Sequence, residues 1–326
     1  MMWISHAMRS GGAGRAHGRS IGAAGLAVAA ALTLLAGLLA PPPAAAADAP
    51  AVYETPEAAA QALLAAFEGQ DMDAILAVLG EAFKDELFPE GEIRDPESLQ
   101  KIVAASRDAL QLREDDANTR VMVIGKNAWP VPFPIVREAA GWHFDTDAGL
   151  DEVFARRIGE NELAMIDLLR AYVDAQIQYA SADRDADDVL EYAQKFVSDS
   201  GHKNGLYWAD DDGDVSPFGP FIAELPDYAL NREAGDPFMG YHLRILSRQG
   251  ADAAGGRYDY VINGNMIAGF GAIAVPAVYG ETGVMTFIVS HRGRVYEKDL
   301  GEDTQLIAAA IQEYNPDATW TVVEEE

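Results

Sequence analysis

Residues 156–196 read RRIGENELAMIDLLRAYVDAQIQYASADRDADDVLEYAQKF, and this stretch decides the fold. From Leu163 onward, apolar residues recur at steps of three and four, which predicts an amphipathic α-helix. The stripe is wider than a surface helix needs, so the helix is expected to be the central packing element of its domain. Its rows are Ile166, Leu169, Val173, Ile177 and Ala180; Leu168, Tyr172, Ala175 and Tyr179; and the polar Asp167, Arg170, Asp174 and Gln178.

An acidic loop follows this helix, and a second helix is expected after the loop. Asp183, Asp185 and Asp187 alternate as the first ligands of an EF-hand calcium loop do. Val189 then supplies a backbone carbonyl, and Glu191 and Gln194 occupy the ninth and twelfth positions. Helices on both sides would provide the context that the motif requires. These six residues are the candidate metal ligands, and Ca²⁺ is the expected cofactor.

Two departures weaken the calcium pattern. The sixth position holds Asp188 where glycine is usual, although aspartate tolerates a left-handed backbone better than most residues. The twelfth position holds neutral Gln194, so no bidentate carboxylate closes the site. The sequence therefore predicts a weak structural site, with a dissociation constant on the order of 0.1 to 1 mM. The alternative is a solvated acidic loop without metal.

The chain before the long helix predicts a small α+β domain over residues 51–152. Thr55-Pro56-Glu57 and Asp71 mark the starts of two helices, and Asp95-Pro96-Glu97 marks a third. Short apolar runs then indicate antiparallel strands, which three nearby prolines confine to an edge. The expected helices span 56–67, 72–79 and 96–112, and the expected strands span 121–124, 133–136 and 141–144.

The chain after the acidic loop predicts a sheet that packs on the long helix, in a second domain over residues 153–326. Asn263-Gly264 is the strongest hairpin signal, and residues 291–293 form a second turn. The expected strands span 241–247, 258–262, 266–275, 284–290 and 295–298, and a last helix is expected over 304–314. Helices combined with antiparallel strands place the whole chain in the α+β class.

Residues 1–47 have the features of a secretory signal peptide. Arg9, Arg15 and Arg19 precede an apolar run over 21–40, and small residues fit cleavage after Ala46 or Ala47. The sequence thus predicts a periplasmic or secreted protein that leaves the membrane once the segment is removed. The alternative is an uncleaved membrane anchor, because about 20 apolar residues can cross a bilayer.

Charge and cysteine content exclude several functions. The first 47 residues contain three arginines and no acidic residue, so the rest carries 21 basic and 52 acidic residues, a net −31. Such a surface repels a phosphate backbone, which makes nucleic acid a poor partner. The chain has no cysteine, which excludes disulfides, thiolate nucleophiles and cysteine-ligated zinc.

Many spaced motifs resemble the bacterial exported family catalogued as domain of unknown function 2950. They are WHFDTDAGLDEVFARRIGENEL, YVDAQIQYA, DRDADDVLEYAQKF, GLYW, GYHLRILSRQGADAAGG, YDYVINGNMIAGFGAIAVPAVYG, GVMTFIV and VYEKDLG. The resemblance covers nearly everything after residue 47 and implies an exported bacterial protein without an established activity. The family usually has glycine after the third aspartate of the acidic loop, where this chain has Asp188.

Each domain also has a likeness in topology. Helices followed by strands that end on Trp142-His143-Phe144-Asp145 resemble the cone-shaped nuclear-transport-factor-2-like folds. In the second domain, one long helix and the sheet ending in residues 279–295 resemble the globular part of type II secretion pseudopilins. A whole domain lies between the apolar leader and that helix, which a pseudopilin does not have.

Signals for an enzyme are few. The sequence has no GxSxG, HExxH, CxxC or glycine-rich phosphate loop, and only His143, His202, His242 and His291 follow the leader. We therefore expect a non-enzymatic binding or envelope-assembly module whose partner is a protein or another envelope component. One alternative is a hydrolase or isomerase with His143 and Asp145 in an N-terminal pocket, and another is a pilus-associated or secretion-system-associated subunit.

Overall fold

The predicted central helix is α6, Thr146–Tyr179, a single helix of 34 residues. It begins upstream of the apolar stripe because Asp145 Oδ1 accepts the N–H of Ala148 at 3.1 Å and so caps the first turn. At 1.5 Å per residue the helix is about 50 Å long. It ends at Tyr179, where the acidic loop begins.

The computed structural model describes residues 48–89, 93, 96–184, 187–209, 213–223 and 236–324. The chain divides into two compact units, Met1–Val153 and Phe154–Glu326, and the division falls within α6. Each unit is described separately below. The predicted leader, residues 1–47, lies outside the described residues. No helix in the described part of the chain has both the length and the apolar character needed to cross a membrane.

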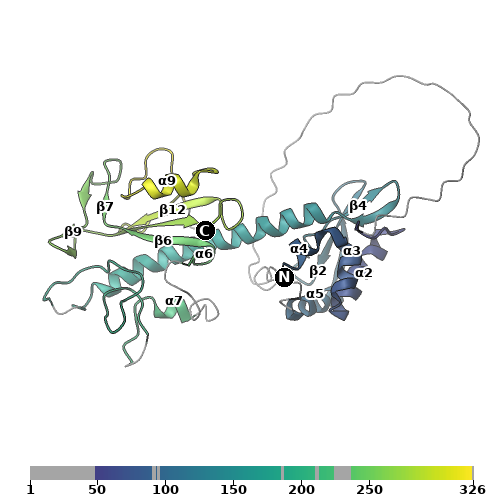
Figure 1. The fold of residues 1–326 in the computed structure, drawn as a ribbon, viewed down its shortest axis with the longest axis horizontal. Coiled ribbons are helices and arrows are strands. Elements are labelled where there is room, and N and C mark those ends of the chain that lie inside the picture. The colour runs from purple at the N-terminus through teal and green to yellow at the C-terminus, as the bar shows by residue number, and fades with distance from the viewer. Residues whose placement is uncertain are drawn as a thin grey trace, which may run out of the picture. The chain divides into compact units, whose positions relative to one another are not determined.

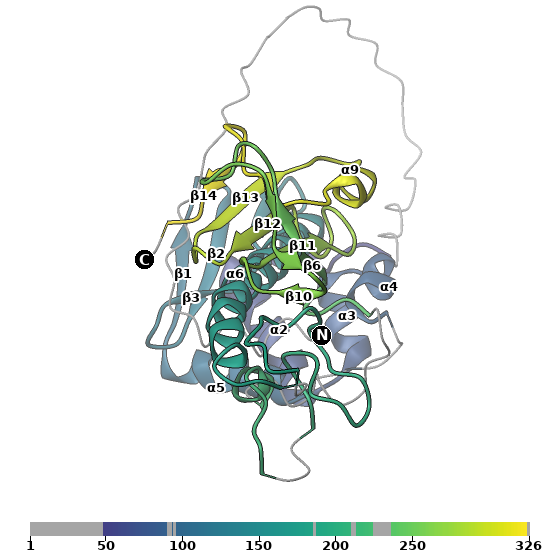
Figure 2. The ribbon, with the colours of Figure 1, turned by 90° about the vertical axis from the view of Figure 1, so that its left-hand side faces the viewer.

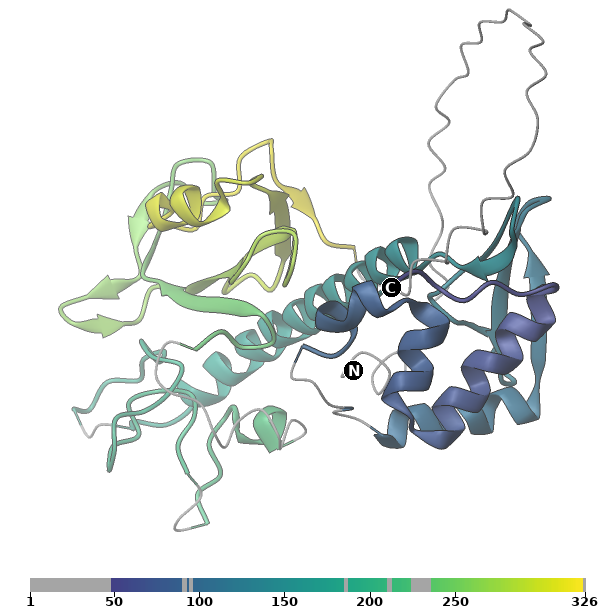
Figure 3. The same ribbon diagram turned by 45° about the vertical axis from the view of Figure 1, so that its right-hand side comes forward.

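The first unit packs helices against an antiparallel sheet (Figure 3). Thr55 Oγ1 accepts the N–H of Ala58, and Asp71 Oδ1 accepts that of Ala74, so both predicted caps are confirmed. The helices are α2 (Pro56–Gly69), α3 (Met72–Leu79), α4 (Lys84–Leu87) and α5 (Pro96–Asp108), with a 3₁₀ turn at Glu81–Phe83. The strands are β1 (Leu110–Glu114), β2 (Thr119–Ile124), β3 (Trp129–Pro130), β4 (Ile135–Glu138) and β5 (Gly141–Phe144).

Strand order in this sheet is β1-β2-β4-β5, and β3 pairs with β2. The helix predicted to reach residue 112 ends at Asp108, because Leu110 to Glu114 pair with β2 instead. The alternation of Leu110, Gln111, Leu112 and Arg113 suits this strand. The core between helices and sheet includes Leu63, Phe67, Ile102, Phe133 and Phe144, which are fully buried.

The second unit has three layers: α6, a five-stranded antiparallel sheet, and α9 (Thr304–Ala310) (Figure 1). The sheet order is β14-β13-β12-β11-β6, and Figure 2 shows these strands side by side. Its strands are β6 (Tyr241–Leu246), β11 (Gly271–Pro276), β12 (Met285–Ser290), β13 (Val295–Asp299) and β14 (Thr321–Val322). The remaining elements are α7 (Gly219–Ala223), β7 (Arg248–Gln249), β8 (Tyr258–Asp259), β9 (Val261–Ile262) and β10 (Asn265–Met266).

Alternate residues of the sheet form two cores. Ala272, Ala274, Phe287 and Val289 face α6, whereas Ile273, Val275 and Ile288 face α9. This period of two is what a sheet buried on both faces requires. Together the two units confirm the predicted α+β class.

Turn chemistry places two hairpins as predicted. Asn263 and Gly264 have φ of 53° and 98° and join β9 to β10, the left-handed pair that a tight hairpin needs. Gly293 N donates to Ser290 O in the turn between β12 and β13. The strand predicted over 266–275 is interrupted, because the N–H groups of Ile267 and Ala268 both donate to Tyr260 O. The last helix ends at Ala310, short of the predicted residue 314.

Gln176 carries a buried amide that joins α6 to the chain beyond the acidic loop. Its Oε1 accepts the N–H of Ala193 at 2.8 Å, and its Nε2 donates to Ala193 O at 2.8 Å. Nε2 also donates to Tyr172 Oη at 3.0 Å, and Tyr172 Oη donates to Gly271 O at 3.0 Å. One side chain therefore satisfies both backbone groups of Ala193 and links the helix to β11.

Replacing this amide should destabilise the fold strongly. We expect Gln176→Leu to lower the free energy of unfolding by about 2–4 kcal/mol, because it leaves two buried backbone groups of Ala193 without partners. Gln178→Leu, at an exposed position two residues further on, is the matched control and should change it by about 0.5 kcal/mol or less. Urea unfolding measures both, and equal effects would contradict the role given to Gln176.

Candidate functional site

Two carboxylates of the acidic loop accept hydrogen bonds from the loop's own backbone. Asp183 Oδ2 accepts the N–H of Asp188 at 3.0 Å, and Asp187 Oδ1 accepts that of Val189 at 2.8 Å. Asp188 has φ of 66°, the left-handed conformation for which glycine is usual at this position. Asp188 therefore has the backbone conformation that is expected at the sixth position of the predicted loop.

The later residues of the pattern contact the β9–β10 hairpin. Asp187 Oδ2 accepts from Asn265 Nδ2 at 2.7 Å, and Glu191 Oε2 accepts the N–H of Met266 at 2.8 Å. Gln194 Nε2 donates to Gly264 O at 2.7 Å. Side chains that the sequence predicted as calcium ligands thus hold the hairpin turn against the loop.

The structure leaves the calcium hypothesis as a prediction. Within the described ranges, no group of three or more His, Asp or Glu side chains is placed to hold a metal ion. Asp185, one of the predicted ligands, lies outside the described residues. Asp183 and Asp187 remain exposed, and Val189 is half-buried.

The prediction of a helix after the acidic loop is wrong. Residues 189–196 have no helical structure. Their backbone groups bond to distant partners: Tyr192 N donates to Met266 O, Ala193 bonds to Gln176, and Lys195 O accepts from Leu206 N. A helix would need those groups for its own i to i−4 bonds. Without the second helix, the helical context of an EF-hand is missing.

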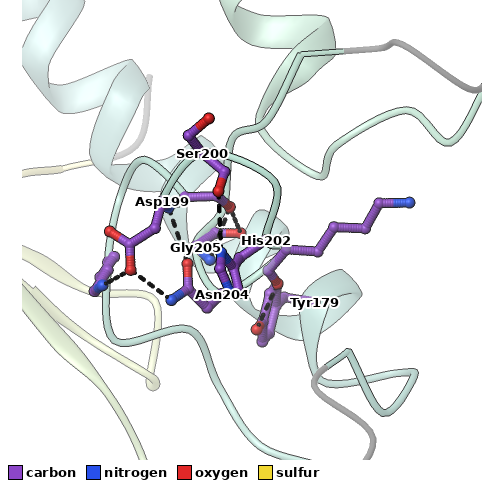
Figure 4. A network of polar contacts seen from close by, with 9 residues as sticks. Tyr179, Asp199, Ser200, His202, Asn204 and Gly205 are labelled. Atoms are coloured by element: carbon purple, nitrogen blue, oxygen red, sulfur yellow. Dashed lines mark hydrogen bonds and ion pairs between the residues drawn. The ribbon is translucent and has the colours of Figure 1, made fainter.

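A compact polar loop, residues 198–205, covers the end of α6 (Figure 4). Asp199 and Asn204 face each other, since Asn204 Nδ2 donates to Asp199 Oδ2 at 2.9 Å and Asp199 N donates to Asn204 Oδ1 at 3.0 Å. Lys195 Nζ also donates to Asp199, and this bond lowers the pKa of the Asp199 carboxyl the most. Tyr179 Oη donates to Lys203 O at 2.9 Å, so the loop is tied to the helix.

Two cations gather on Trp208 beside this loop. The guanidinium carbon of Arg184 lies 5.3 Å from the Trp208 ring centroid, and Lys203 Nζ lies 5.7 Å from it. Lys203 Nζ donates to Asp214 Oδ2 at 2.7 Å, and Trp208 Nε1 donates to Asp214 O at 2.8 Å. The guanidinium carbon of Arg184 also lies 5.8 Å from the ring centroid of Tyr179, the last residue of α6, so these cation–π contacts connect the loop to the end of the helix.

The histidine and aspartate proposed for an N-terminal enzyme pocket have separate surroundings. Asp145 caps α6 through Ala148, and Asp145 N donates to Pro134 O. His143 lies on β5, where it pairs with Val136. A pocket around them therefore stays a prediction.

Several groups with displaced pKa values in the second unit are buried tyrosines. Burial raises the pKa of Tyr172, Tyr241 and Tyr260, so their hydroxyls act as hydrogen-bond donors. Tyr260 Oη, for example, donates to Gln249 Oε1 at 3.0 Å. Burial also lowers the pKa of His291, whose ring packs edge-on against Tyr260 and favours the neutral imidazole. These groups support packing.

A hollow of about 350 Å³ lies on the α9 side of the sheet. It is bordered by β12, β13, α9 and the segment that returns to β14. Its apolar lining comes from Ile288, Leu300, Ile307, Ile311 and Trp320. Ile307 is 40% exposed and the neighbouring Leu306 is 75% exposed, so an apolar surface adjoins the opening.

The polar rim of this hollow is held in place by hydrogen bonds. Glu313 Oε2 accepts from Arg257 Nη1 at 2.9 Å, and Lys298 Nζ donates to Thr319 Oγ1 at 2.6 Å. Asp317 Oδ1 accepts the N–H of Thr319 at 2.8 Å. The rim is therefore preorganised around the apolar lining.

A second hollow of about 250 Å³ lies on the opposite side of α9, next to β6. His242, Arg244, Gln305, Ala308 and Ala309 contribute to it. Arg244 Nη2 donates to Ala308 O at 3.0 Å and to Ile311 O at 2.6 Å, so it caps the C-terminal end of α9. Burial lowers the pKa of Arg244.

Sequence reasoning missed both hollows. Ile288, Leu300, Ile311 and Trp320 are spread over four elements or loops with no motif spacing among them. The segment 304–311 did contain a usable signal. With Leu306 and Ile307 it has more apolar residues than a short helix needs to cover one face.

The family model described as protein of unknown function (DUF2950) matches residues 50–323, which is most of the chain. No curated protein and no solved structure matches this chain.

The calcium prediction can be tested directly. If the acidic loop binds Ca²⁺, calorimetric titration of the protein lacking residues 1–47 should give a dissociation constant on the order of 0.1–1 mM. Saturation should then raise the melting temperature, because the ion binds only the folded state. An Asp183→Ala/Asp185→Ala variant should lose both effects. Absence of heat and of a thermal shift in the unmodified protein would reduce the loop to a hydrogen-bonded support for the hairpin.

Proposed function

The chain belongs to the DUF2950 family of proteins of unknown function, and we propose that it is an exported, non-enzymatic binding module. In this proposal the hollow beside Trp320 takes an apolar group of a protein or another envelope component. The observation that carries the proposal is the combination in one place of an apolar lining, a preorganised polar rim and an opening to solvent.

The dimensions of the hollow support this use. Its volume of about 350 Å³ falls at the lower end of the range of about 300–1,000 Å³ for small-ligand sites. An apolar lining with a few fixed polar groups is the usual composition of such sites. The indole of Trp320 offers a large apolar contact area, and Lys298 Nζ lies 5.8 Å from its ring centroid.

The rim chemistry favours binding over catalysis. Glu313 is paired with Arg257, and Lys298 and Asp317 both contact Thr319. A catalytic acid or base needs a pKa matched to its task and access to the reacting group. Paired charges at the rim are better suited to orienting a ligand.

Export is proposed from the leader. Residues 1–47 combine a basic start, an apolar run and small residues before Asp48. On this proposal the protein works in the periplasm or outside the cell. The absence of cysteine is compatible with either place.

Filling the hollow provides the test of binding. Ala310 is exposed and lines the hollow beside Trp320, whereas its neighbour Ala309 is exposed and lines the other hollow. NMR shift mapping with a panel of small aromatic and aliphatic fragments should identify ligands that move the Leu300 and Ile311 amides. Ala310→Phe should weaken this binding at least tenfold with an unchanged melting temperature, and Ala309→Phe should leave it intact. Fragments that bind both variants equally would refute this site.

Export has its own test, which separates the proposal from its rivals. N-terminal sequencing of the protein from its native host is expected to find Ala47 or Asp48 first, in a soluble envelope or medium fraction. An uncleaved leader and cofractionation with the inner membrane would favour the pilus-associated subunit. The enzyme alternative would be favoured if fragments gathered at His143 and Asp145 instead of the hollow.

A further inference from the structure

The outer edge of β6 presents open backbone groups. β6 is the edge strand of its sheet among the described strands, and Figure 2 shows it at one end of the row. His242 pairs with Val275, Arg244 pairs with Ile273, and Ala277 N donates to Gly240 O at 2.7 Å. In an antiparallel ladder the bonding direction alternates, so even-numbered residues of β6 bond to β11 and odd-numbered residues point outward.

The outward-pointing backbone groups of β6 form hydrogen bonds at both ends of the strand and are open in its middle. Tyr241 exchanges backbone bonds with Phe238, at 2.6 and 2.9 Å, and Ser247 O accepts from Tyr260 N at 2.8 Å. Between them, the N–H and C=O groups of Leu243 and Ile245 bond to no other strand or loop that the structure describes. Edge groups of this kind form a template for another extended chain.

The α9 side of this open edge carries the positive charge of Arg244. Arg244 caps α9 through Nη2, and none of the ion pairs among the described residues includes it. His242 lines the same hollow next to it. A half-buried arginine of this kind is unexpected in a chain with 52 acidic and 24 basic residues.

We infer that the open edge of β6 binds an extended segment of a partner protein, in antiparallel register, with Asp or Glu opposite Arg244. Backbone bonds to Leu243 and Ile245 would supply the pairing, as in other cases of strand addition to a sheet edge. The position opposite Arg244 lies between these two bonded pairs, where facing Cα atoms are only about 4.5 Å apart. A carboxylate there can reach the free donors of the guanidinium, and the hollow beside Ala309 gives its side chain room.

A second copy of this chain fits the same edge poorly. A two-fold pairing can use both Leu243 and Ile245 only if it is centred on Arg244, because Tyr241 and Ser247 are already bonded. That register places Arg244 directly opposite the Arg244 of the second copy. Like charges in facing positions are destabilising, so the edge selects an acidic partner.

This surface is separate from the hollow beside Trp320 and does not depend on the proposed function. The two lie on opposite sides of α9, and each is lined by a different one of the neighbouring residues Ala309 and Ala310. Ala309→Phe and Ala310→Phe therefore separate the two proposals. Failure of one leaves the other standing.

The test uses the chain without residues 1–47 and two nine-residue peptides with blocked ends. Both peptides alternate threonine and valine around a central residue, which is Asp in one and Lys in the other. We expect calorimetry to show at least tenfold tighter binding of the Asp peptide. In the free protein, hydrogen exchange should be fast at the amides of Leu243 and Ile245 and slow at those of His242 and Arg244. The Asp peptide should slow the first pair at least tenfold.

Variants separate the charge from the backbone pairing. Arg244→Gln keeps an N–H donor for the α9 carbonyls but loses the charge, so it should remove the preference for the Asp peptide and leave weak binding. Ala309→Phe should weaken the Asp peptide at least fivefold, and Ala310→Phe is the matched control without effect.

Three results would overturn the inference. These are equal binding of the two peptides, slow exchange of Leu243 and Ile245 in the free monomer, and a dimer in sedimentation that protects these amides without peptide. The last result would assign the edge to a second copy instead.

Discussion

The buried amide of Gln176 is the interaction on which the second unit most depends. In folded proteins a polar group away from water must find its partners within the chain. Gln176 meets this need for itself and for both backbone groups of Ala193, while Tyr172 carries the connection on to Gly271. Helix α6 thereby fixes the position of the segment around Ala193, which has little regular structure of its own. No disulfide is available for this purpose.

Other side chains extend the same principle. Tyr179 Oη donates to Lys203 O, Glu191 Oε2 accepts from Met266 N, and Gln194 Nε2 donates to Gly264 O. Each bond ties a loop to a neighbouring element through one backbone group. Irregular chain is costly to order, because fixing each residue loses about 1–2 kcal/mol of conformational entropy. Several such bonds, together with the cation–π contacts of Trp208, offset this loss where helices and strands do not.

Local signals predicted the local features of the fold. Thr55 and Asp71 cap helices, and Asn263-Gly264 makes a hairpin. Most of the predicted apolar stripe of α6 is buried, but Leu163 and Ile177 are exposed, so the buried face is narrower than the spacing indicates. The errors arose where distant partners decide the structure. Residues 189–196 have a pattern compatible with a helix, yet their backbone groups form hydrogen bonds with Gln176 and Met266. The alternating aspartates have the spacing of metal ligands, and the described ones serve as hydrogen-bond acceptors. The open edge of β6 follows from strand order, which no short stretch of sequence encodes.

The position of α9 has a consequence for how this family can vary. Adjacent residues of a helix point about 100° apart, so Ala309 and Ala310 belong to different surfaces although they are neighbours in the chain. The helix is a partition only seven residues long. Single substitutions on it can therefore reshape one of the two hollows and leave the other unaltered, so the two surfaces can vary independently among members of the family.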